Sequence, residues 1–145
     1  MVSALRDPGT ADHPGTPLQR VQIIKGWADA EGVFHQDVHD VAAAVASDAD
    51  VDPATCRPRG AGADSLCGVW RDPDFDPQRR AVYYARVVEN PSCRYDGWVC
   101  VRAEEEARPA FCGATPRTIQ ERAWTSPIWY TPGRESLPAG RSHGS

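Results

Sequence analysis

Five cysteines are the residues of this sequence with the clearest chemistry. Cys93 and Cys100 enclose the stretch Arg-Tyr-Asp-Gly-Trp-Val. A redox pair needs C-x-x-C and a zinc site needs closely spaced cysteine pairs, and the sequence contains neither pattern. Asp-Gly is a preferred centre of a two-residue hairpin turn, which would place Cys93 directly opposite Cys100. Opposed residues lie about 4.5–5.5 Å apart between Cα atoms, so a disulfide is predicted.

A second disulfide is predicted between Cys56 and Cys67, which flank a glycine-rich loop. Closing that loop contributes roughly 3 kcal/mol in the chain-entropy account of disulfides. Cys112 is then left unpaired. Two bridges can be drawn among five cysteines in several ways, so pairing of Cys112 with Cys93 or with Cys100 stays open.

Three aspartates alternate in the segment DPDFDP and resemble the start of a calcium loop. An EF-hand continues with glycine at its sixth position and glutamate at its twelfth. Counted from Asp72, those positions hold Pro77 and Tyr83. Asp72, Asp74 and Asp76 are therefore weak metal candidates, and the segment is predicted to be a rigid turn between strands.

Two histidines also share a strand face with an aspartate. His35, Asp37 and His39 alternate, but the histidines lie about 13 Å apart at roughly 3.3 Å per residue. That spacing favours exposed polar alternation over a shared metal. Ser126 has no glycine-flanked turn, and no phosphate-binding or dinucleotide-binding motif occurs. We expect neither a catalytic residue nor a cofactor in this chain.

Composition excludes several classes of protein. A net charge of −4 gives no basic footprint for nucleic acid. No run reaches the roughly 18 apolar residues of a membrane helix, so no membrane insertion is expected. Five cysteines favour an exported protein, yet the first residues, MVSALRDPGT, do not form a signal peptide.

Thirteen prolines and twelve glycines leave little room for long helices. Residues 18–41 alternate as a hairpin would, although the spacing of Val38, Val41 and Val45 also fits a short helix. Residues 81–89 are rich in β-branched and aromatic side chains. The expected fold is mostly β, an antiparallel sandwich-like unit with long irregular loops.

Three domain segments follow from this pattern. Residues 1–17 are expected to be a truncated strand remnant with a polar lead-in, so the unit is incomplete at its N-terminus. Residues 18–132 are expected to form a β-rich accessory domain. Residues 133–145 are rich in Ser, Gly, Arg and Pro and are expected to be a disordered tail.

Three blocks of sequence carry a family resemblance: GTPLQRVQIIKGW, VWRDPDFDPQRRAVYYARVVENPSCR and TIQERAWTSPIWYTP. In this order they resemble the C-terminal region of the bacterial domain of unknown function 3604 family, from about Val2 to Pro132. The resemblance implies a longer parent protein, periplasmic or extracellular, with an upstream region similar to metal-dependent phosphoesterases. Its divalent metal would belong to that region, since no ligand position matches here.

The resemblance implies a truncated fragment: a non-catalytic accessory region of an exported, hydrolase-like protein, whose partner is the catalytic domain in cis. The alternative is an autonomous secreted binding module for carbohydrate or cell-envelope material, with Trp98 or Trp129 exposed for stacking. The oligomeric state is not predicted. Core or interdomain packing is expected for the family-block aromatic residues Trp27, Trp70, Tyr83, Tyr84, Trp124, Trp129 and Tyr130.

Overall fold

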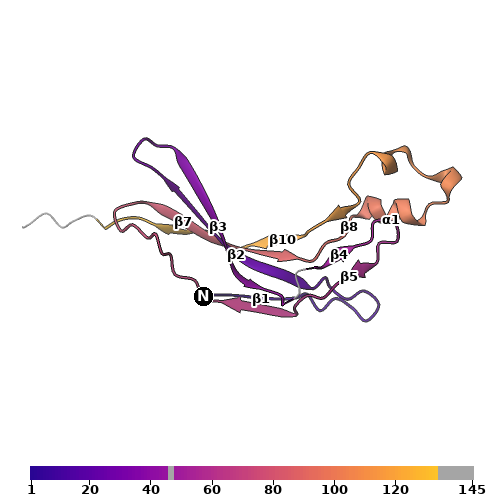
Figure 1. Ribbon diagram of the computed structural model, residues 1–145, viewed down its shortest axis with the longest axis horizontal. Helices are drawn as coiled ribbons and strands as arrows, with labels where there is room; N and C mark the ends of the chain where they lie inside the picture. Colours follow the sequence, from indigo (N-terminus) through magenta and orange to yellow (C-terminus); the bar gives the residue numbers. More distant parts are fainter. Residues whose placement is uncertain (46–47, 134–145) are drawn as a thin grey trace, which may run out of the picture.

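The structure is a computed structural model, and it describes residues 1–45 and 48–133. The molecule is elongated, with a long antiparallel sheet at its centre and a helical segment at one end (Figure 1). In chain order the elements are β1 (Val2–Leu5), β2 (Leu18–Ala28), β3 (Phe34–Ala43), β4 (Asp50–Val51), β5 (Pro58–Arg59), β6 (Ser65–Gly68), β7 (Ala81–Glu89), β8 (Ser92–Cys93), α1 (Tyr95–Arg102), the 3₁₀ turns η1 (Glu105–Ala107) and η2 (Ala110–Gly113), β9 (Thr118–Ile119), β10 (Arg122–Trp124) and β11 (Ile128–Tyr130).

The central sheet has five strands. Strand β2 lies in the middle and pairs antiparallel with β3 on one side and β7 on the other, while β10 and β11 pair with successive parts of β7. The hairpin expected for residues 18–41 is therefore confirmed, with its turn at residues 29–33. The mostly β, antiparallel character and the irregular loops are confirmed as well.

A second, two-stranded sheet packs against the first. Strand β1 pairs with β6, and both lie over one face of the central sheet near the start of β2 (Figure 1). Leu18, Val21 and Leu66 are buried where the two sheets meet. The partly buried side chains around them are Val2, Ala4, Val41, Ala42, Ala63 and Val87. This contact gives the fold its two-layered, sandwich-like core.

The central sheet has two unlike faces because side chains alternate along each strand. The closed face carries Val21, Ile23, Lys25 and Trp27 of β2 with the residues opposite them on β3 and β7, and it receives β1, β6 and the segment 69–80. The open face carries Gln22, Ile24, Gly26 and Ala28 of β2. It also carries the residues paired with them on β3 and β7, including Phe34, Val38, Val82 and Tyr84.

Two expectations concern the chain ends. Val2–Leu5, expected as a strand remnant, pairs with β6 over four residue pairs. The disordered tail was expected over residues 133–145, of which all but Gly133 lie outside the described residues.

The packing of β6 on β2 yields a stability prediction. Leu66→Ala removes a buried side chain between the two sheets and is expected to lower the free energy of unfolding by about 2–4 kcal/mol. Val69→Ala changes an exposed apolar residue three positions later and is expected to stay within about 0.5 kcal/mol of the wild type. Urea titrations of both variants measure this; equal losses would contradict the packing.

Candidate interaction site

A buried ion pair fixes the segment 69–80 on the closed face. The Lys25 Nζ lies 2.6 Å from Asp72 Oδ2, and the two side chains are only 7% and 9% exposed. Tyr83 donates its hydroxyl to the same carboxylate oxygen at 2.7 Å, and Lys25 also donates to the Asp74 carbonyl at 3.0 Å. The ammonium lies 5.2 Å from the centre of the Trp27 ring. Every partner of this network comes from β2, β7 or the segment between β6 and β7.

The electrostatics follow from this burial. Burial of the Asp72 carboxyl opposes its ionisation, but the hydrogen bonds from Lys25 and Tyr83 outweigh that effect and lower its pKa. Burial of the Tyr83 hydroxyl raises its pKa well above the ordinary value. The hydrogen bond to Asp72 and the negative charge of that carboxylate raise it further. At neutral pH the site is therefore a carboxylate held between an ammonium and a neutral phenol. This arrangement holds the segment 69–80 on the sheet.

The sequence did not single out Lys25, although a signal was present. It is the one charged residue of the apolar run Ile23-Ile24-Lys25-Gly26-Trp27. A lysine in the middle of a central strand requires a partner because an unpaired buried charge is costly.

The three alternating aspartates have separate roles. Asp72 binds Lys25, and its second oxygen accepts the Asp74 N–H at 3.0 Å. Asp76 accepts the Gln78 N–H at 2.8 Å and contacts Arg79. The structure shows turns in this segment between β6 and β7, as the sequence predicted. Within residues 1–45 and 48–133, no group of three or more His, Cys, Asp and Glu side chains is placed to hold a metal ion.

The histidines of β3 also pair with other groups. His35 lies 2.7 Å from Asp29 across the hairpin turn and stacks on Trp27, with ring centres 5.4 Å apart. His39 packs on Trp70 at 4.6 Å. Asp37 is exposed. The three residues do not converge on one point.

The disulfides differ from the predicted pairs. Cys56 is bonded to Cys93 and Cys100 to Cys112, with Cα atoms 5.5 Å and 5.6 Å apart, while Cys67 is free and exposed. The predicted bridges Cys93–Cys100 and Cys56–Cys67 are wrong, and so is the unpaired state predicted for Cys112. Pairing of Cys100 with Cys112, one of the alternatives left open, is what the structure contains.

A helix explains the difference. Asp96 and Gly97 do not form a hairpin turn, because neither has a positive φ and both lie in the first turn of α1. Asp96 accepts hydrogen bonds from Arg94 Nε and from the Gly97 N–H. A carboxylate at this position also stabilises the helix, because the N-terminus of a helix carries partial positive charge. Glycine is needed at 97 because a Cβ would lie 2.5 Å from the Arg117 carbonyl oxygen.

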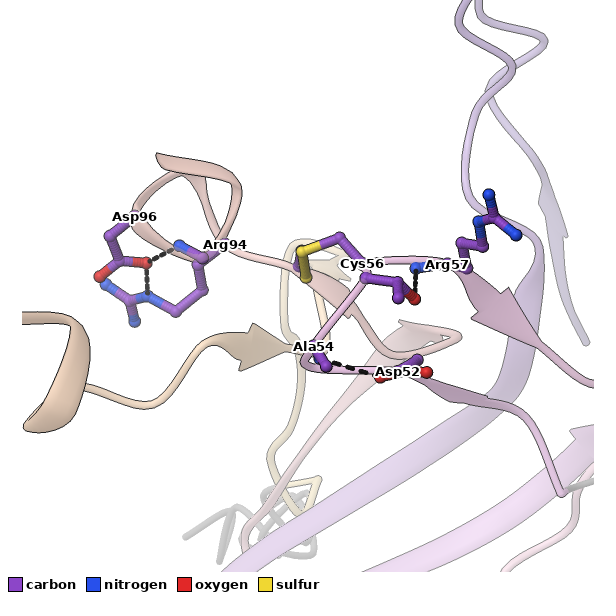
Figure 2. The surroundings of a disulfide bond; sticks show 9 residues. Asp52, Ala54, Cys56, Arg57, Arg94 and Asp96 are labelled. Atoms are coloured by element: carbon purple, nitrogen blue, oxygen red, sulfur yellow. Dashed lines mark hydrogen bonds and ion pairs between the residues drawn. A yellow bond between two sulfur atoms is a disulfide. The ribbon is translucent and has the colours of Figure 1, made fainter. Parts of the chain in front are cut away.

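The two bridges join the segments at the end of the molecule that contains α1. Figure 2 shows the loop of Cys56 meeting the chain just before α1, with Arg94 and Asp96 beside it. Cys56 itself has a positive φ of 56°, and its N–H bonds the Asp52 carbonyl at 2.7 Å. The bridges span 37 and 12 residues. In the chain-entropy account they contribute roughly 4 and 3 kcal/mol.

The open face of the central sheet presents aromatic side chains to solvent. Phe34 is 87% exposed, Trp124 58% and Trp129 74%. Trp129 and Phe34 stand on either side of a groove whose floor includes Gly26 and Val82. The groove has a volume of about 380 Å³ and its walls are largely apolar. None of the seven family-block aromatic residues expected in the core or in interdomain packing is fully buried.

A second cavity lies at the disulfide-bonded end. It has a volume of about 580 Å³ and lies among the residues 14–17, β4, β5, β8 and α1. Trp98 of α1, partly exposed, forms part of its wall, and Arg102 lies over the Trp98 ring at 5.1 Å. Asn90 also lines the cavity, and its buried Oδ1 has no hydrogen-bond partner.

Comparison with known families identifies the chain. The family model described as protein of unknown function (DUF3604) matches residues 1–132. The chain belongs to this family. None of the curated proteins and none of the solved structures matches it. Among the described residues of this DUF3604 chain, no helix is long and apolar enough to cross a membrane.

The disulfide pattern of the DUF3604 chain can be checked directly. Peptide mapping of oxidised, alkylated protein under non-reducing conditions is expected to join the peptide of Cys56 to that of Cys93 and the peptide of Cys100 to that of Cys112. Cys67 is expected to be the one alkylated cysteine because it is exposed and unpaired. A peptide joining Cys93 to Cys100 would contradict the structure.

The ion pair predicts a dependence of stability on pH. Asp72→Asn leaves the Lys25 ammonium buried without its counter-ion, and is expected to cost about 3 kcal/mol of unfolding free energy at pH 7. The pKa of Asp72 is lowered on folding, so its stabilisation is complete above its ordinary value of 3.8 and is lost as the pH falls through the lower folded value.

The gap between wild type and Asp72→Asn should therefore close in strongly acidic buffer, as measured by denaturant titrations at a series of pH values. Asp12→Asn is the matched control, because Asp12 is an exposed carboxylate in a loop. A gap that is constant between pH 7 and pH 2 would contradict the role given to Asp72.

Proposed function

We propose that this chain is a non-catalytic, β-rich accessory region of an exported protein, and that its open face docks on a neighbouring catalytic domain of the same polypeptide. The observation that carries this proposal is the exposure of Phe34, Trp124 and Trp129 on one side of the sheet. Clustered exposed aromatic residues mark interaction surfaces because burying them is favourable. The other side of the same sheet is already occupied by β1, β6 and the segment 69–80.

The shape of the open face supports docking. Small side chains at Gly26 and Ala28 keep the floor of the groove low, and the larger Trp129 and Phe34 rise at its edges. A Cβ at position 26 would lie 3.1 Å from the Val82 side chain, so glycine keeps this floor flat. Such a surface accepts a protruding apolar element of a partner, with the aromatic rings as its anchors.

The nature of the partner rests on the family resemblance. It points to an upstream domain similar to metal-dependent phosphoesterases, and the divalent metal of the parent protein would be bound there. Two disulfides are compatible with an extracellular or periplasmic protein, since such bonds persist in oxidising compartments.

An autonomous binding module is the second candidate, and one observation favours it. The cavity beside Trp98 has both polar and apolar walls and a volume typical of small-molecule sites. A saccharide ring is the ligand class that combines stacking on tryptophan with hydrogen bonding to polar groups.

The docking proposal is tested by binding in trans. The chain is mixed with the separately purified upstream domain of a longer family member, and affinity is measured by calorimetry. Trp129→Ser is expected to weaken binding at least tenfold, as the loss of a buried aromatic anchor does. Val69→Ser is the matched control, because Val69 is equally exposed and belongs to the segment on the closed face.

Equal affinities for the wild type and the Trp129→Ser variant would contradict docking through the open face. The binding-module candidate makes a different prediction. A saccharide array probed with the chain alone would give a signal that Trp98→Ala removes and Trp129→Ser leaves unchanged.

A further inference from the structure

The outer edge of β3 is a long strand edge without a partner among the described residues. Strand β3 ends the order β10-β7-β2-β3, and it runs for ten residues. Residues Phe34 to Val38 and Asp40 are exposed. Such an edge presents unpaired N–H and C=O groups that can bond another strand.

The hydrogen bonds elsewhere in the sheet determine which groups point outward. Ala85 of β7 exchanges bonds with Thr125, on the side away from β2. Residues bond alternately to the two sides of a strand, so Ile23, opposite Ala85, bonds β3 rather than β7. Ile23 lies opposite His39, and the odd-numbered residues of β3 therefore bond β2. The hydrogen bond from the Asp29 N–H to the Val33 carbonyl follows the same alternation, since Val33 is also odd-numbered.

The even-numbered residues of β3 consequently direct their backbone groups outward. These are Phe34, Gln36, Val38 and Asp40. We propose that a second copy of this chain pairs with this edge, antiparallel, around a twofold axis at Val38, so that the two five-stranded sheets become one. This inference does not depend on the docking proposed for the open face.

The polar side chains of β3 favour this register over its neighbours. With the axis at Val38, Asp37 of each copy lies opposite His39 of the other, and Gln36 lies opposite Asp40. An axis at Asp37 would oppose two aspartates, and an axis at His39 would oppose two histidines. Two carboxylates directly opposite each other destabilise a sheet, whereas a carboxylate opposite an imidazole gains a hydrogen-bond partner.

One other register also opposes histidine to aspartate. An axis at Gln36 brings His35 opposite Asp37, but His35 is already bonded to Asp29 of its own hairpin. With the axis at Val38 the ladder runs from Gln36 to Asp40, because a register shift beyond Asp40 places Ala42 opposite Val21 and turns its backbone groups toward β2.

A contact through one strand edge is small and therefore belongs with weak, concentration-dependent complexes. Sedimentation velocity of the oxidised 145-residue chain, from about 10 μM to about 1 mM, is expected to show a monomer turning into a dimer. Val38 faces itself across the axis, so Val38→Lys and Val38→Glu each place like charges together. Each variant alone is expected to remain monomeric.

An equimolar mixture of Val38→Lys and Val38→Glu is expected to dimerise again, as a one-to-one heterodimer visible by native mass spectrometry. Unchanged thermal melting of each variant confirms that the exposed substitution leaves the fold intact. Trp129→Ser is the control, and it is expected to dimerise like the wild type.

A wild-type chain that is monomeric at about 1 mM would overturn the proposal. So would a mixture of the two charged variants that stays monomeric. A dimer that Trp129→Ser abolishes and Val38→Lys preserves would also overturn it, because that dimer would form through the open face.

Discussion

The buried ion pair between Lys25 and Asp72 is the interaction on which the arrangement of this molecule depends. It joins the middle of the central strand to the segment that crosses from β6 to β7. With Tyr83 bonded to the same carboxylate, that segment is fixed over one face of the sheet. Because a buried charge needs its partner, the pair keeps this segment on the face that β1 and β6 also cover, and the other face remains available.

Different parts of the molecule are stabilised in different ways. Apolar packing between β2 and β6 joins the two sheets, whereas two disulfides tie together the segments around α1. Each end also offers a different surface: an apolar groove beside Trp129 at the sheet end, and a mixed polar and apolar cavity beside Trp98 at the other. We propose that both surfaces serve contact with other molecules.

Strands with a clear alternation were predictable from the sequence, and pairs that depend on tertiary contact were not. The residues 81–89 and the hairpin 18–41 follow from local side-chain patterns that the tertiary structure reinforces. The cysteine pairs failed because Asp96-Gly97 suits a hairpin turn equally well, while contact with Arg117 and the bond to Cys112 place it in a helix. Lys25 was overlooked because its partner lies 47 positions away in the sequence.

We propose that the open face is buried in longer members of the family. Hydroxyl-radical footprinting of Trp124 and Trp129, in this chain and in a longer family member that includes the upstream domain, measures that burial directly. Our account predicts rapid oxidation of both tryptophans in this chain and strong protection of the equivalent residues in the longer protein. Equal oxidation rates in the two proteins would contradict it.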